Sequence, residues 1–110
     1  MITRLYTGDD GQSHFEELDM DIGPYPWGEL KDATGVMFRH DEPGKFIDWH
    51  VAPRRQFIIT LSGEVEIGAS DGSKRVLRAG DVRLMEDVAG KGHSHHDLSP
   101  SAAVYILLDD

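Results

Sequence analysis

The residues best suited to chemistry in this chain are histidines, together with one glutamine, on short segments that read as strands. Gln56 closes the segment Asp48–Gln56 (DWHVAPRRQ), and a second segment, Gly90–Leu98 (GKGHSHHDL), is rich in histidine. Imidazole is the commonest metal ligand and also a general acid or base near neutral pH. The two segments therefore predict a metal site or an acid–base site if the fold brings them together. They hold four of the six histidines: His50, His93, His95 and His96.

Alternation along a strand decides where the side chains of the first segment point. Successive side chains of a strand face opposite ways, so Asp48, His50 and Ala52 share one face. Trp49 and Val51 share the other. If the large apolar side chains pack between sheets, the polar face turns either to solvent or to the interior of a barrel.

The second segment shows the same alternation. His93, His95 and Asp97 lie on one face, whereas His96 lies on the other. For His96 we expect an ordinary exposed strand residue. For His95 both interpretations stay open, a ligand that faces a cavity and an exposed strand residue.

The segment that follows the first histidine is apolar on both faces. In Gln56–Leu61 (QFIITL), Gln56 and Thr60 are the only polar residues, so we expect the strand to be buried on both sides. Gln56 would then be a buried amide, and both its oxygen and its nitrogen would need partners.

The rest of the chain reads as a succession of short strands. Helical periodicity is scarce, and runs of alternating polarity are broken by turn sequences such as Ser62-Gly63, Asp71-Gly72 and Gly80-Asp81. About ten strands in one small chain predict a single all-β domain over residues 1–110, a sandwich or a barrel. The predicted strands are Ile2–Thr7, Ser13–Met20, Ala33–Arg39, Phe46–Val51, Gln56–Leu61, Glu64–Ala69, Lys74–Arg78, Val82–Glu86, Gly92–Leu98 and Ala103–Leu108.

Composition narrows the classes of partner and compartment. The chain has 110 residues, with 11 basic and 20 acidic side chains and a net charge of -9, which argues against nucleic acid or an anionic membrane as partner. It has no cysteine, so thiolate metal sites and disulfides are excluded. We see no signal peptide and no apolar run near the roughly 20 residues of a membrane span. We therefore expect a cytoplasmic protein.

The stretch from Gly44 to Gly63 resembles the first conserved motif of the cupins. It reads Gly44-x5-His50-x-Ala52-x3-Gln56-x6-Gly63, against the family pattern G-x5-H-x-H-x3,4-E-x6-G. In that family both histidines and the glutamate are metal ligands. The two glycines and His50 keep their register, but Ala52 stands at the second histidine and Gln56 at the glutamate.

The second cupin motif, G-x5-P-x-G-x2-H-x3-N, is recognisable between Gly80 and Asp97. Gly90-x2-His93-x3-Asp97 matches its second half, with an aspartate at the asparagine. Val88 replaces the proline, and the stretch from Gly80 is two residues longer than the pattern.

The two motifs cover a core of residues 44–97, and the resemblance implies a fold. That fold is a small single-domain cupin of the RmlC-like jelly-roll superfamily, a double-stranded β-helix. It does not imply one activity, because cupins include dioxygenases, isomerases, epimerases, lyases, storage proteins and sugar-binding regulators.

The family's ligand set, carried onto this chain, implies His50, Gln56 and His93 as metal ligands, with His95 as a further candidate. Ala52 cannot ligate, and Gln56 adds no negative charge, so we expect the ion to be held more weakly. Three protein ligands leave coordination positions open, as in catalytic metal sites. The expected ion is Fe, Mn, Ni or Zn.

Three functions stay open for this site. The first is a metal enzyme of dioxygenase, isomerase or lyase type that acts on a small polar or anionic molecule. The second is a metal-free enzyme in which His50 and His93 act as acid and base. The third is a non-catalytic module that binds a small molecule or a sugar without metal.

Other side chains are candidates for binding that small molecule. An arginine at the mouth of a barrel would hold a carboxylate or phosphate by a forked pair of hydrogen bonds. Arg55 could instead pair with Glu64 or Glu66 on the surface. Trp27 lies in the irregular segment Asp21–Lys31, which reads either as a flap or as a surface connection. The candidates are Arg39, Arg55, Arg83, Asp48 and Trp27.

Assembly is the last expectation from the sequence. Strands that are apolar on both faces, such as Gln56–Leu61 and Ala103–Leu108, need cover on both faces. Small cupins often pair their sheets across a two-fold axis, so we expect a homodimer.

Overall fold

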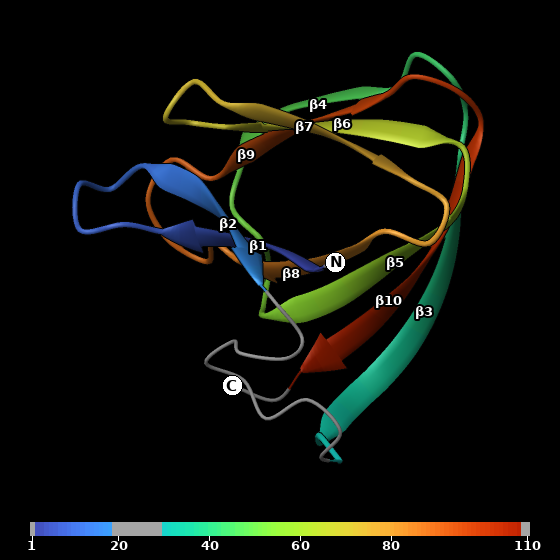
Figure 1. The fold of residues 1–110 in the computed structure, drawn as a ribbon, viewed down its shortest axis with the longest axis horizontal. Coiled ribbons are helices and arrows are strands. Elements are labelled where there is room, and N and C mark those ends of the chain that lie inside the picture. Colours follow the sequence, from blue (N-terminus) through green and yellow to red (C-terminus); the bar gives the residue numbers. More distant parts are fainter. Residues whose placement is uncertain (1, 19–29, 109–110) are drawn as a thin grey trace.

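The computed structural model describes residues 2–18 and 30–108, and within these ranges the regular structure consists entirely of β-strands. Figure 1 shows them as two facing sheets that enclose a barrel. The strands are β1 (Ile2–Thr7), β2 (Ser13–Leu18), β3 (Ala33–Asp41), β4 (Phe46–His50), β5 (Gln56–Ser62), β6 (Glu64–Ala69), β7 (Lys74–Arg78), β8 (Val82–Glu86), β9 (His93–Asp97) and β10 (Ser101–Leu108).

The all-β prediction is confirmed, and each predicted strand is found. Within the described ranges, no strand boundary differs from the prediction by more than two residues. In the described part of the chain there is no helix long and apolar enough to span a membrane.

The two sheets differ in size. The larger has the strand order β2-β1-β8-β5-β10-β3, and the smaller has the order β4-β9-β6-β7. Neighbouring strands are antiparallel except for β1 and β8, which are parallel. Consecutive strands therefore cross repeatedly from one sheet to the other, and this brings the first motif in β4 and β5 against the second in β9 (Figure 1).

The tight turn between β5 and β6 depends on Gly63. Its φ is +81°, and a Cβ at this position would collide with the Pro100 carbonyl oxygen. Only glycine meets both conditions without strain. This explains physically why the first motif ends in a glycine.

The side chains that point into the barrel alternate along each strand with side chains that point outward. On β5, Ile58 and Thr60 face inward and are buried, together with Ile67 of β6 and Leu5 of β1. Leu61, on the outer face of the same strand, is half exposed. The prediction that this strand is buried on both faces therefore fails at Leu61, whereas Phe57, at the other end of the outer face, packs against the buried cluster of Ile2, Leu18 and Leu84.

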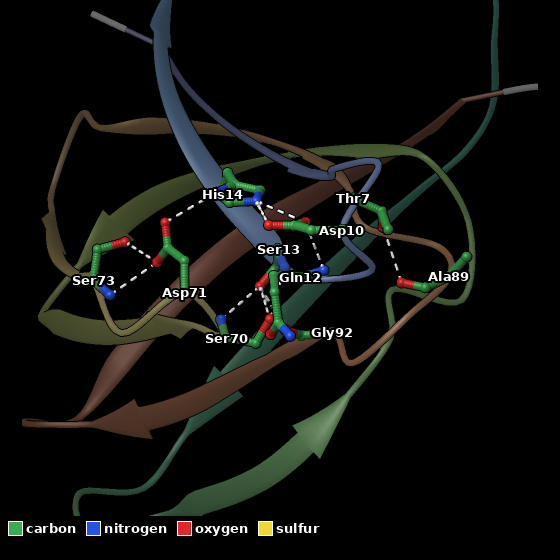
Figure 2. Close-up of polar contacts among 10 residues, drawn as sticks. All are labelled: Thr7, Asp10, Gln12, Ser13, His14, Ser70, Asp71, Ser73, Ala89 and Gly92. Atoms are coloured by element: carbon green, nitrogen blue, oxygen red, sulfur yellow. Dashed lines mark hydrogen bonds and ion pairs between the residues drawn. The ribbon is translucent and has the colours of Figure 1, made fainter.

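The β1–β2 hairpin is tied to the opposite sheet by the polar network in Figure 2. The backbone N–H groups of Ser13 and Ser70 each donate to the other residue's hydroxyl, at 2.7 and 2.8 Å. The Ser13 hydroxyl donates to the Gly92 carbonyl at 2.6 Å. The network thus fixes the backbone immediately before His93.

His14 adds a pH-dependent contact to this network. Its Nε2 lies 3.0 Å from an Asp10 oxygen and its Nδ1 lies 3.1 Å from Asp71, so both nitrogens can donate only when the ring is protonated (Figure 2). The hydrogen bond to Asp10 raises the pKa of His14. The stability that this contact contributes is full below the unfolded pKa and is lost as pH rises through the raised pKa.

Candidate functional site

Both motifs meet at a cavity of about 260 Å³ inside the barrel. The wall combines three histidines, two arginines, a glutamine and a tyrosine with apolar side chains, and no carboxylate is among the described residues that form it. Its residues are Met37, Arg39, Ile47, His50, Ala52, Pro53, Gln56, Ile58, Arg83, Met85, His93, His95 and Tyr105.

His50 and His93 are brought together by the pairing of β4 with β9. The two residues are register partners, and their ring centroids lie 4.3 Å apart at an interplanar angle of 56°. The backbones approach closely because Gly92 has no side chain: a Cβ there would collide with the His50 carbonyl oxygen. Gly92 also has a φ of +74°. It is therefore the residue that allows this histidine pair to form.

Both imidazoles are oriented through Nδ1. In His50 this atom lies 2.7 Å from the Asp48 backbone carbonyl oxygen, and in His93 it lies 2.5 Å from Asp87 Oδ2. Both partners are acceptors, so Nδ1 carries the hydrogen in each ring, and Nε2 is the nitrogen left to bind a metal. Metal-binding histidines are held in this way by a carboxylate or a backbone carbonyl.

Asp87 is a part of the site that sequence reasoning missed. Its side chain is fully buried, and it follows β8 directly. The second motif is two residues longer here than the family pattern, and Asp87 lies within that longer stretch. The extra length is the signal that could have drawn attention to it.

Gln56 faces the same cavity from the start of β5. It is only 6% exposed, yet its amide has no hydrogen-bond partner among the described residues. Buried amides in proteins are almost always paired. Ala52, which also lines the cavity, is buried as well and has no atom that can bind a metal. The cavity therefore contains the metal-binding atoms of His50, Gln56 and His93, but no ligand at the position of the second histidine of the cupin motif.

His95 lines the cavity but belongs to a second cluster. Its Nε2 lies 3.1 Å from Asp97 Oδ1, and ligand atoms of Asp41, His95 and Asp97 all lie within 4.8 Å of one another, close enough to hold one ion. Burial lowers the pKa of His95, which Asp97 offsets only in part, so the ring is neutral near pH 7.

One oxygen of each carboxylate in this second cluster already has partners. Asp41 pairs with Lys45 at 2.9 Å and lies 3.5 Å from Arg39, while Asp97 accepts a hydrogen bond from Ser101 at 3.0 Å. Burial raises the pKa of Asp41, but Lys45 and Arg39 outweigh this and keep it below its usual value. These contacts compete with a bound ion for the same oxygens.

Two arginines reach the cavity, at different depths. Arg39, on β3, is partly exposed and lies over the Tyr105 ring, with 5.6 Å between its guanidinium carbon and the ring centroid. Arg83, on β8, is 3% exposed. Burial lowers the pKa of Arg83, and the neighbouring Tyr105 and Asp97 oppose this.

Asp48 does not line the cavity, although the alternation rule places it on the same face as His50. The pairing of β4 with β9 shifts register between Ile47 and His50, so these two residues both face the cavity. The Asp48 side chain is exposed and accepts from the Trp49 backbone N–H at 2.8 Å. The prediction that Asp48 and His50 share one face is therefore wrong, because a bulge between them turns the Asp48 side chain away from the cavity.

The remaining candidates lie elsewhere. Arg55 is outside the cavity wall, and its Nε donates to Glu86 at 2.6 Å rather than to the expected Glu64 or Glu66. His96 lies on the outer face, as expected, in an edge-to-face contact with Phe46. Trp27 lies outside the described residues.

Comparison with known proteins supports the fold. No protein-family model and no curated protein matches the chain. Solved structures do match. A double-stranded β-helix protein from Klebsiella pneumoniae is 23% identical, with a TM-score of 0.52 over 82% of this chain and 86% of that one. A Cupin 2 conserved barrel domain protein from Salinispora arenicola is 22% identical, with a TM-score of 0.52 over 84% and 80%.

A conserved protein of unknown function from Streptococcus pyogenes is also similar, at 17% identity and a TM-score of 0.57 over 74% of this chain and 69% of that one. At these identities the likeness establishes the fold alone. The chain thus has the double-stranded β-helix fold of the cupins, and the resemblance seen in its two motifs is confirmed at that level.

Proposed function

We propose that this cupin-fold protein holds a divalent metal ion through His50, Gln56 and His93 and binds a small polar or anionic molecule beside it. The observation that carries the proposal is the Gln56 side chain, which is 6% exposed, lines the cavity and has no hydrogen-bond partner among the described residues. The oriented Nε2 atoms of the two histidines supply the other donors. Imidazole and amide donors suit Zn, Fe, Ni or Mn.

The donor set fits an ion that is held loosely and open to a ligand. Three neutral donors contribute no charge, and Ala52 leaves a coordination position free. An ion bound there would act as a Lewis acid toward an oxygen atom of the ligand. The chain's own residues would surround the ligand with a wall of mixed polarity and orient it through the arginines. We propose that the activity is of dioxygenase, isomerase or lyase type, as found among cupins.

Metal titration of untagged protein tests this proposal. We expect Zn²⁺ or Ni²⁺ to bind with one-to-one stoichiometry, and His50→Ala and His93→Ala each to weaken binding strongly. His96→Ala is the matched control, because this histidine lies on the outer face, and it should bind as the wild type does. Unchanged binding in His50→Ala, or loss only in His95→Ala, would contradict the assignment.

A second candidate, a non-catalytic binding module without metal, is favoured by one observation: the cavity wall has no carboxylate among its described residues. Carboxylates strengthen divalent sites by their charge. If the untagged protein binds none of the four metals on titration while still binding small anions, this second function replaces the first.

We also propose that the chain forms a homodimer through the outer face of β3 and β10. Val36 and Phe38 on this face are 61% and 73% exposed, and they lie beside Ile106 and Val104 of β10. Strand β3 is also the edge of its sheet. Light scattering should give twice the chain mass, and Phe38→Lys should give the monomer; a monomeric wild type would refute the proposal.

A further inference from the structure

Arg83 is a buried cation without a hydrogen-bond partner in the described part of the chain. It lies in the middle of the larger sheet, between Thr3 of β1 and Ile58 of β5, and is 3% exposed. Its guanidinium has five N–H donors, and none makes a hydrogen bond or ion pair with a described residue. Five other arginines, all of them more exposed than Arg83, each have a carboxylate partner: Arg4, Arg39, Arg55, Arg75 and Arg78.

The nearby carboxylates do not satisfy this guanidinium. Asp97 and Asp41 are close enough to act on Arg83 electrostatically, yet neither lies within ion-pair distance of it. Arg83 Nε and Asp97 Oδ2 are both buried, and neither has a hydrogen-bond partner among the described residues, so no hydrogen bond joins these two atoms. A buried charge is costly unless it is paired. Arg83 therefore points to a partner from outside the chain.

The cavity that Arg83 lines sets the chemistry of this partner. In a chain of net charge -9, the described wall has two arginines and no carboxylate, which favours an anion. One unpaired guanidinium matches one negative charge, whereas a doubly charged phosphate would also face Asp41 and Asp97 behind the wall. The remaining wall is mainly apolar, with Met37, Ile58 and Met85 among its residues.

We propose that Arg83 anchors a small organic monocarboxylate, whose two oxygens face the planar guanidinium and whose apolar body lies against the methionine and isoleucine side chains. Paired N–H donors of arginine fit a carboxylate in this way. The proposal rests on the proposed use of the cavity as a ligand site, but it does not depend on the metal.

Butyrate and butyramide form a matched pair of probes, because they differ mainly in charge. We expect butyrate, followed by chemical shifts in ¹⁵N-labelled protein, to perturb the cavity residues and the Arg83 side-chain N–H signal, and butyramide to bind far more weakly. Arg83→Gln should weaken butyrate binding by about tenfold or more. Arg83→Lys should show an intermediate loss of butyrate affinity, because lysine keeps the positive charge but not the paired N–H donors of the guanidinium.

Arg75→Gln is the control, since Arg75 pairs with Glu17 away from the cavity, and it should bind butyrate normally. Equal binding of butyrate and butyramide, normal butyrate binding by Arg83→Gln, or no butyrate binding by the wild type would overturn the proposal. Tighter binding of inorganic phosphate would overturn the carboxylate assignment.

If Arg83→Gln does not fold, Arg83→Lys and the pair of probes still decide. Zn²⁺ titration of the same samples separates the two proposals. Normal metal binding without butyrate binding defeats only the Arg83 assignment. Butyrate binding by a wild type that takes up no metal defeats only the metal site.

Discussion

Replacing Asp87 by asparagine removes one negative charge from beside His93 and keeps the size of the side chain. The amide oxygen can still accept the Nδ1 hydrogen, so the ring keeps its orientation and its tautomer. What is lost is a charge-assisted bond of 2.5 Å between two side chains that are 7% and 0% exposed. Solvent screens a pair buried so deeply only weakly, so the imidazole feels the full loss of the negative charge.

Loss of such a partner typically weakens metal binding by about 10- to 100-fold, or roughly 1.4 to 2.7 kcal/mol. Because this pair is short and buried, we expect a value in the upper half of that range. The assay is a Zn²⁺ titration of wild type and Asp87→Asn, with thermal melting to confirm that both proteins are folded.

Asp97→Asn is the matched variant, because Asp97 is also fully buried and also contacts a histidine of the cavity wall. If the ion lies in the proposed site, this variant keeps a metal affinity within a few-fold of the wild type. If the ion binds instead to Asp41, His95 and Asp97, the two variants exchange their behaviour. Asp87→Asn with normal affinity would refute the role assigned to Asp87 behind His93.

Three further changes test other parts of the structure. Ala52→His places a histidine where cupins have one, on the wall beside His50, and should tighten Zn²⁺ binding in the same titration; weaker binding would count against the site. Gly92→Ala forces a left-handed residue into the His50 carbonyl and should cost about 2 kcal/mol or more of unfolding free energy, measured by denaturant melts; unchanged stability would contradict this close approach. His14→Gln should lower the melting temperature more at pH 6 than at pH 9, because the pKa of His14 is raised; an equal loss at both pH values would rule out the ionic contact.

The strands could be predicted because their signals are local. Alternating polarity marks most of the strands, and glycines such as Gly63 and Gly72 mark turns with positive φ. The match to the two cupin motifs then predicted that His50 and His93 belong to one site. The structure places these two residues opposite each other in the pairing of β4 with β9.

The rest depends on contacts between distant segments. Nothing near Asp48 in the sequence reveals the bulge that turns its side chain out of the cavity, because the register shift arises in the pairing with β9. The partner of His93 is Asp87, and the partner of Arg55 is Glu86; both lie at or just after the end of β8. Whether Gln56 and Arg83 find partners is likewise a property of the assembled cavity.

The most direct test of the metal site is a crystal structure of protein soaked in Zn²⁺, with data recorded on both sides of the zinc absorption edge. We predict one anomalous peak in the cavity, at about 2.0–2.1 Å from Nε2 of both His50 and His93 and within reach of the Gln56 oxygen. A peak between Asp41, His95 and Asp97, or no peak in the cavity at saturating Zn²⁺, would contradict the proposed metal site.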